Sequence, residues 1–134
     1  MKKLLLTLAA ACMASFTFAQ DAPLWMRHCA ISPDGTTIAF TYKGDIYTVP
    51  VGGGRAMQLT TNPAHDTEPV WSPDSKRIAF ASDRMGSMDV YIVSKEGGEP
   101  RRLTTHSGSE TPVVFSDAGH ILFSADIMPS AETV

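Results

Sequence analysis

The chain has 134 residues, of which 43% are hydrophobic and 19% charged, with a formal net charge of −3. Its basic residues occur as isolated pairs, Lys76-Arg77 and Arg101-Arg102, so the clustered positive charge of a nucleic-acid-binding protein is missing. Helical periodicity is absent after the first twenty residues, which argues against an all-α fold.

The first nineteen residues have the pattern of a secretory signal peptide. Lys2 and Lys3 precede the apolar run Leu4 to Ala11, and Thr17-Phe-Ala19 is a small-residue cleavage site. The apolar run is shorter than the roughly 20 residues of a membrane-spanning helix. Lipidation at Cys12 is the alternative. We therefore expect residues 1–19 to be removed and the protein to be exported, periplasmic or secreted, with no membrane span.

Removal of this segment takes away two lysines and no acids, so the formal charge becomes −5. It also removes Cys12 and leaves Cys29 without an intrachain partner, even in an oxidising compartment. Because Cys29 lies in an apolar stretch, we expect it to be a buried small hydrophobe.

The remainder of the chain is predicted to be a series of short strands. A β-favouring stretch from Leu24 to Ile31 runs into the turn Ser32-Pro-Asp-Gly35, and three more strands follow, separated by Lys43-Gly44 and Val51-Gly-Gly-Gly54. These three strands are Ile38–Tyr42, Asp45–Val49 and Ala56–Leu59.

The same series then repeats. Pro69-Val-Trp-Ser-Pro-Asp-Ser-Lys-Arg-Ile-Ala-Phe80 matches Ala30 to Phe40 at a spacing of 40 residues, and Val114 to Phe123 matches it again about 44 residues on. The change of spacing falls in one loop, Asp83 to Met88, where the first repeat has only Lys43-Gly44. Four short strands in each repeat of about 40 to 45 residues predict an all-β fold of β-propeller blades.

The repeats divide the chain into two full blades and a partial third, at residues 24–61, 69–105 and 112–134. Propellers of this kind have about 4 to 8 blades, so we expect these residues to be an incomplete part of a larger propeller, with the remaining blades and further domains elsewhere in the full-length chain. In such a meander, the second-to-third and blade-to-blade loops lie at one end. The longer polar loops therefore share one rim, where we expect a partner or substrate to bind.

Trp71-Ser-Pro-Asp-Ser-Lys-Arg-Ile-Ala-Phe-Ala-Ser-Asp-Arg-Met-Gly86, with Asp89-Val-Tyr91 and Gly97-Gly98, resembles the WD40-like β-propeller repeat of the TolB type. Ser75 departs from the usual turn glycine. Because a blade follows the signal with almost no spacer, the arrangement is most similar to the start of an exported tricorn-like serine peptidase. The resemblance implies a non-catalytic propeller that guides or gates a peptide substrate. The alternatives are a TolB-like protein-binding scaffold and the propeller of a dipeptidyl-peptidase or prolyl-oligopeptidase relative.

The rim residues that could contact a peptide or protein partner are His65, Asp66, Glu68, Asp83, Arg84, His106 and Glu110. The first three lack a second ligand set at metal spacing, so we expect a plain polar loop and no metal. His106, Ser107 and Glu110 are residue types that can form a catalytic triad, but no Gly-x-Ser-x-Gly nucleophile elbow accompanies them. We predict no catalytic residue and no cofactor here, and we expect the Asp83–Met88 loop to be solvated.

Residues that recur in each repeat are interpreted as scaffold. Asp34 and Asp74 recur in the first turn of each repeat, and Asp45 and Asp89 recur at the head of the third strand, which favours structural hydrogen bonding. The glycine pairs are hairpin turns and not a phosphate cradle, because no helix follows them. Ile31, Trp71 and Phe115 hold equivalent positions and are expected to fill the space between neighbouring blades.

Overall fold

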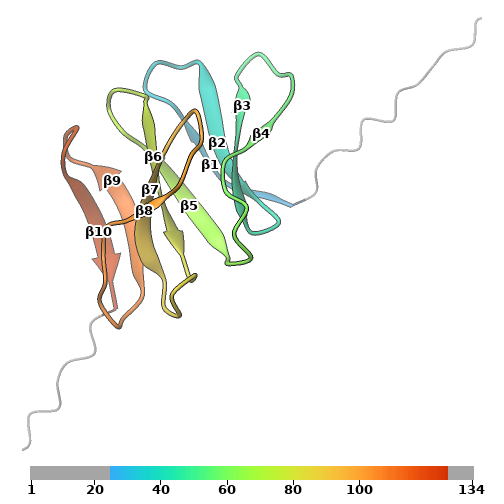
Figure 1. Cartoon of the computed structure of the whole chain (residues 1–134). Helices are drawn as coiled ribbons and strands as arrows, with labels where there is room; N and C mark the ends of the chain where they lie inside the picture. Colours follow the sequence, from blue (N-terminus) through green and yellow to red (C-terminus); the bar gives the residue numbers. More distant parts are fainter. Residues whose placement is uncertain (1–24, 127–134) are drawn as a thin grey trace, which may run out of the picture.

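The computed structural model describes residues 25–126, which form ten β-strands arranged in three antiparallel sheets (Figure 1). The predicted signal peptide and the last eight residues lie outside the described residues. Sheet A has the order β1-β2-β3-β4, sheet B the order β5-β6-β7-β8, and sheet C pairs β10 with β9. The strands are β1 Met26–Ile31, β2 Thr37–Tyr42, β3 Asp45–Pro50, β4 Met57–Gln58, β5 Asp66–Trp71, β6 Arg77–Ser82, β7 Asp89–Ser94, β8 Arg101–Arg102, β9 Glu110–Phe115 and β10 Ile121–Ala125.

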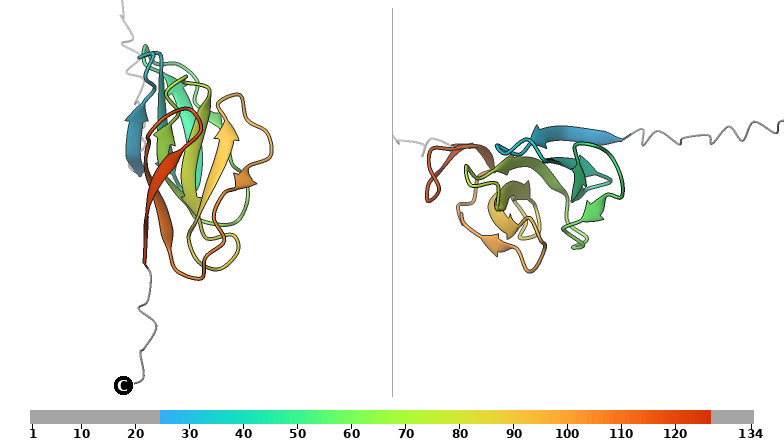
Figure 2. Two further views of the ribbon diagram at one scale, coloured as in Figure 1. Left: turned by 90° about the vertical axis from the view of Figure 1, so that its left-hand side faces the viewer. Right: turned by 90° about the horizontal axis from the view of Figure 1, so that it is seen from above.

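The all-β prediction of two four-stranded blades and a partial third is confirmed. Consecutive strands pair in meander order, and the innermost strands β1, β5 and β9 contact one another across the sheets. Seen from above, the three sheets stand side by side (Figure 2). No helix long and apolar enough to cross a membrane is found in the part of the chain that the structure describes.

Each full sheet repeats the same details of backbone and register. The first strand bulges at His28 in sheet A and at Glu68 in sheet B, and both residues have a left-handed φ, of 50° and 54°. Ser75, which stands where the repeat usually has glycine, also adopts a left-handed φ of 57°. Its hydroxyl accepts a hydrogen bond from the Asp34 backbone N–H at 3.1 Å, so the serine links the turns of neighbouring sheets.

Two hydrophobic clusters fill the spaces between the sheets. Sheet B contributes Trp71, Ile78, Phe80, Tyr91 and Val93 to the cluster shared with sheet A, which supplies Ala39, Ile46 and Leu59. The cluster between sheets B and C contains Ala79, Val90, Ile92 and Phe115. The alternation of side chains along each strand therefore sends one set of residues to each neighbour.

Two expectations about burial were wrong. Trp71 and Phe115 are buried between sheets as predicted, but Ile31 is 64% exposed. Its strand lies in sheet A and its side chain points away from sheet B, toward a face that no sheet of residues 25–126 covers. Cys29 is also exposed and not buried, because it lies beside the bulge at His28 on the same uncovered strand.

The recurring turn aspartates are structural, as predicted. Asp34 accepts hydrogen bonds from Ser32 Oγ at 2.6 Å and from the Thr36 backbone N–H at 3.0 Å, and Asp74 accepts the equivalent bonds from Ser72 and Lys76. These donors stabilise the ionised carboxylate. The bond from Ser32, followed by those from Thr36, lowers the pKa of Asp34 to about 2.

A titration of the chain followed by carboxyl-carbon NMR tests this turn. We expect the Asp34 resonance to titrate near pH 2, below the ordinary 3.8, while Asp45 titrates above its ordinary value because burial raises its pKa. A group with a depressed folded-state pKa stabilises the fold above the unfolded pKa, so the contribution of Asp34 is lost as the pH falls from about 4 to about 2. Ser32→Ala should move the Asp34 midpoint upward and leave that of Asp45 in place. Equal midpoints in the wild type would contradict the hydrogen bonding described.

Candidate functional site

The loops of the structure gather at two opposite ends of the sheets. At the lower end in Figure 1, the Asp66 N–H donates to Gly44 O at 2.7 Å, and the Glu110 N–H donates to Met88 O at 2.7 Å. These bonds join each second-to-third loop to the start of the first strand of the next sheet. We call this end the loop rim; it comprises residues 43–44, 60–65, 83–88 and 103–109. The opposite end, the hairpin rim, holds turns 32–36, 51–56, 72–76, 95–100 and 116–120.

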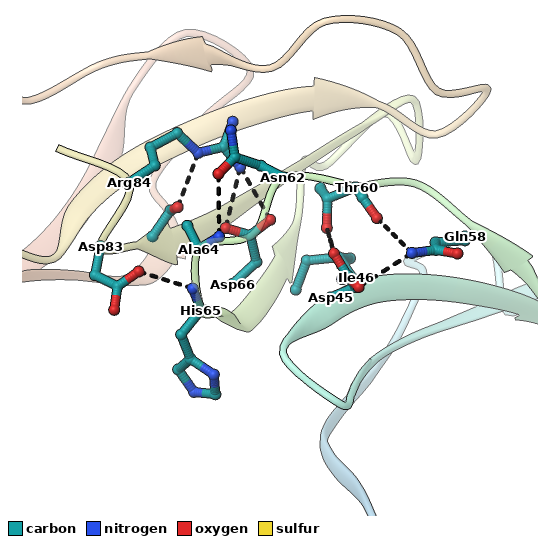
Figure 3. Close-up of polar contacts among 11 residues, drawn as sticks. Asp45, Ile46, Gln58, Thr60, Asn62, Ala64, His65, Asp66, Asp83 and Arg84 are labelled. Carbon is teal, nitrogen blue, oxygen red and sulfur yellow. Dashed lines mark hydrogen bonds and ion pairs between the residues drawn. The ribbon is translucent and has the colours of Figure 1, made fainter.

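Asp66 and Arg84 are parts of the scaffold and not free rim residues. Asp66 is the first residue of β5 and is fully buried, whereas the sequence placed it in a loop. The Arg84 Nη2 donates to both carboxylate oxygens of Asp66, at 3.0 and 2.9 Å, and its Nε donates to Ser82 Oγ at 2.9 Å (Figure 3).

The Arg84 side chain is only 10% exposed, so the expectation of a solvated loop at this residue was wrong. Its guanidinium lies over the rings of Tyr91 and Phe80, with centroid distances of 4.5 and 5.6 Å. The inserted loop of the second repeat therefore carries an arginine back over its own sheet, where it neutralises the buried carboxylate of Asp66.

Glu68 and Glu110 are also strand residues. Glu68 forms the bulge of β5 and is half-buried. Glu110 is the first residue of β9, pairs with Ala125 and is buried, in the position that Asp66 holds in sheet B. β5 and β9 each carry a register shift, at Glu68 and between Pro112 and Val114, and both strands start before the apolar run that marked them in the sequence.

His65, Asp83 and His106 remain as accessible side chains of the loop rim. His65 is exposed and donates its backbone N–H to Asp83 Oδ1 at 2.7 Å, as Figure 3 shows. The His106 ring accepts a hydrogen bond from the Gly108 N–H at 3.1 Å. The seven predicted rim residues are thus not brought together as one site; two of them form a buried ion pair, two others lie in strands, and three line the rim.

The third-strand aspartates hold each sheet to its last strand, which confirms their structural role. Asp45 Oδ2 accepts from Gln58 Nε2 at 3.0 Å, and Asp89 Oδ2 lies 2.7 Å from Nη2 of Arg102, which occupies the position of Gln58. In both sheets a threonine hydroxyl completes this junction. The hydroxyl of Thr60 accepts a hydrogen bond from the Ile46 N–H, and that of Thr104 accepts one from the Val90 N–H, both at 2.9 Å.

A cavity of about 460 Å³ opens at the loop rim beside His65. Its walls are Trp25, Arg27, Thr41, Lys43, Gly44 and His65. Arg27 lies over the Trp25 ring at 5.8 Å, and Lys43 lies over the Tyr42 ring at 5.3 Å. Two cations and an exposed indole thus line a cavity with no acidic wall residue, which suits an anionic or aromatic ligand. Sequence reasoning pointed to His65 but missed the other walls, which lie at the start of β1, in β2 and in the two-residue turn of the first repeat.

In residues 25–126 no group of three or more His, Cys, Asp and Glu side chains lies close enough to hold a metal ion. The loop rim thus presents exposed polar groups on loops that are joined by hydrogen bonds.

Comparison with known proteins agrees with the repeat architecture. The family described as the tricorn protease N-terminal β-propeller domain matches residues 23–133. The chain belongs to this family. Among curated relatives, dipeptidyl-peptidase 5 of Porphyromonas gingivalis is 41% identical over an alignment of 109 residues that covers 73% of this chain and 16% of that protein. Tricorn protease homolog 1 of Streptomyces coelicolor is 36% identical over 53% of this chain and 6% of its own length.

The TolB resemblance is supported as well. The Tol-Pal system protein TolB of Bordetella pertussis is 47% identical over 34% of this chain and 11% of its own length. The solved structure of a putative TolB from Agrobacterium tumefaciens superposes with a TM-score of 0.60 at 26% identity, covering 67% of this chain and 38% of that one. The tricorn protease structure gives the same TM-score at 16% identity over 75% of this chain and 11% of that one, which shows a shared fold. This chain spans only a small part of each of these relatives.

Proposed function

We propose that the chain is the exported propeller module of a serine-peptidase relative, in which it guides or gates peptides and performs no chemistry itself. The observation that carries this proposal is the loop-rim cavity beside His65, set in a family that includes the tricorn propeller. The relatives named as a dipeptidyl-peptidase and a tricorn protease homolog support a role beside a peptidase. The catalytic groups would lie in other domains of the full-length protein.

Export rests on the signal-peptide pattern of residues 1–19. Under this proposal, the propeller begins soon after the cleavage site at Ala19, with blades at residues 24–61 and 69–105 and a partial blade from 112. The remaining blades and the peptidase domains would be supplied by sequence outside these residues.

The lining of the rim cavity indicates which peptides it would favour. Arg27 and Lys43 present two positive charges, and neither is paired with a carboxylate among the described residues. A peptide carboxylate, from an acidic side chain or a carboxyl terminus, would complement these cations, and the Trp25 indole would accept an apolar neighbour.

Peptide binding tests this proposal. The chain, expressed with its own amino-terminal segment, is isolated in exported form, and its first residue is identified; we expect Gln20. Binding of a Glu/Asp-rich decapeptide and of a Lys/Arg-rich decapeptide, both with an uncharged dye, is then measured by fluorescence anisotropy at low salt. We expect the acidic peptide to bind more tightly, by about tenfold, and to weaken as salt is raised.

The variants Arg27→Gln and Lys43→Gln should each weaken binding of the acidic peptide several-fold. Lys95→Gln removes the same charge from the hairpin rim and should leave binding unchanged. Equal affinities for the acidic and the basic peptide, or an equal loss of affinity in all three variants, would contradict a peptide site at the loop rim. An amino terminus at Met1 would contradict export.

A second candidate function is a protein-binding scaffold without an associated peptidase. It is favoured by the likeness to TolB, at 47% identity over 47 residues. The two functions differ in the domains that accompany the propeller. A serine-peptidase domain encoded in the same gene would support the first function, and blades followed by a stop codon would support the second.

A further inference from the structure

The loop-rim cavity has walls from two neighbouring sheets. Arg27, Thr41 and Lys43 belong to sheet A and to the turn after β2, whereas His65 immediately precedes the first strand of sheet B. Arg27 and Thr41 are paired across the strands, and Thr41 is paired in turn with Ile46, which packs in the cluster between sheets A and B. Residues paired in this way share one face of a sheet. The cavity therefore lies between sheets A and B, and His65 forms its wall on the side of sheet B.

The backbone at His65 is bonded on both sides of the cavity entrance. Its N–H donates to Asp83 Oδ1 at 2.7 Å, and Figure 3 shows the ring pointing away from this aspartate. The N–H of the next residue, Asp66, donates to Gly44 O at 2.7 Å. The turn at Gly44 also approaches the ring, because a Cβ placed on this glycine would stand 3.4 Å from His65 Nδ1. His65 is thus fixed between the turn of the first repeat and the inserted loop of the second.

The inserted loop contributes two consecutive residues to this arrangement. Asp83 accepts the N–H of His65, and Arg84 binds the carboxylate of Asp66. Two neighbouring loop residues therefore bind two neighbouring residues of the connection. The equivalent turn of the first repeat, Lys43-Gly44, has no side chain that can accept a hydrogen bond, so this contact is a property of the insertion.

We propose that His65 is a specificity-determining residue of the rim cavity, whose ring contacts the carboxylate of a bound acidic peptide opposite Arg27 and Lys43, and that Asp83 is the residue that positions it. This inference rests on the proposed function, because it assigns roles within that peptide site. The His65 side chain is exposed, and its ring makes no hydrogen bond within residues 25–126. An imidazole N–H donated to a carboxylate adds a directed contact to the attraction of the two cations.

Asp83 affects such a ligand in two opposite ways. By accepting the His65 N–H, it fixes the backbone from which the ring projects, so less conformational freedom is lost when a peptide binds. Its negative charge beside the cavity disfavours an anionic ligand. Positioning therefore raises the affinity for an acidic peptide and charge lowers it, which allows substitutions to separate the two effects.

Two substitutions of Asp83 make this separation. Asp83→Ala removes the charge and the acceptor, whereas Asp83→Asn removes the charge and keeps a carbonyl oxygen that can accept the His65 N–H. In the anisotropy assay with the Glu/Asp-rich decapeptide, we expect Asp83→Ala to bind at least threefold more weakly than wild type, and Asp83→Asn to bind at least as tightly as wild type. An effect of charge alone would make both variants bind more tightly. Asp117→Ala removes the same charge from the hairpin rim and should change the affinity less than twofold.

A double-mutant cycle shows whether Asp83 acts through His65. His65→Ala should weaken binding of the acidic peptide at least threefold, and Asp83→Ala added to it should cause no further loss. Urea denaturation of each variant checks that it is folded, which we expect because the ion pair of Arg84 with Asp66 is kept in all of them.

Equal affinities of Asp83→Ala and Asp83→Asn would overturn the inference, and so would a loss from Asp83→Ala that persists in the His65→Ala background. An unchanged affinity in His65→Ala would overturn it as well. In each of these cases the proposed function would stand if Arg27→Gln and Lys43→Gln still weaken binding. A wild-type chain without preference for the acidic peptide would overturn both.

Discussion

Replacing Trp71 with alanine should destabilise the fold by about 3 to 5 kcal/mol, as expected for truncation of a large buried side chain. Trp71 is 8% exposed and belongs to the cluster between sheets A and B. Its indole N–H donates to Ala30 O at 3.0 Å, so the substitution removes a hydrogen bond between the sheets as well as apolar contacts. The measurement is urea denaturation of wild type and variant, followed by circular dichroism.

The chain provides a matched control for this substitution. Trp25, its other tryptophan, is 62% exposed, and Trp25→Ala makes the same chemical change at a surface site. We expect the free energy of unfolding to change by less than about 0.5 kcal/mol there. Similar losses for both substitutions would mean that sheets A and B are not held together through Trp71.

Replacing Asp66 with alanine should be about as damaging, at about 3 to 5 kcal/mol, because it leaves the guanidinium of Arg84 nearly buried without its counter-charge. Arg84 would still lie over Tyr91 and bond to Ser82, but two of its hydrogen bonds would have no acceptor. The loss is measured by the same denaturation experiment at neutral pH.

A double-mutant cycle separates the cost of an unpaired charge from the value of the pair. Arg84→Met with Asp66→Ala removes both charges and should recover a large part of the stability lost in Asp66→Ala alone. The first repeat has an apolar residue, Met26, in the position of Asp66, so an uncharged sheet start is compatible with this fold. Additive losses in the double variant would show that the two side chains are not coupled.

The fold could be predicted from the sequence because the repeat supplied several independent signals. Turn residues such as Pro33 and Asp34 recur in each repeat, followed by the alternating apolar residues of a strand. This alternation places Trp71 on the face between two sheets, where the structure has it. Local backbone preference and side-chain alternation agree at these positions, so strand order and register follow from them.

The candidate site could be predicted only in part. Asp66 and Glu110 directly follow the polar segments 62–65 and 106–109, which contain turn-forming residues, and the bulge at Glu68 breaks the alternation that would have joined Asp66 to the apolar run. The burial of Arg84 depends on a loop folding back over Tyr91, which no local pattern encodes. Ile31 is exposed for a different reason, since a repeat pattern gives the face a residue occupies but not whether another sheet covers it.

The hydrogen bonds between neighbouring rim loops have a consequence for how motion would pass along the sheets. At the loop rim, Gly44 O and Met88 O each accept a hydrogen bond from the first strand of the next sheet, and at the hairpin rim Ser75 of sheet B accepts one from the Asp34 turn of sheet A. A tilt of sheet B relative to sheet A would therefore strain bonds at both ends at once. We therefore expect sheets A and B to move as one rigid unit, so that the shape of the loop rim between them is fixed by the fold and does not depend on a ligand.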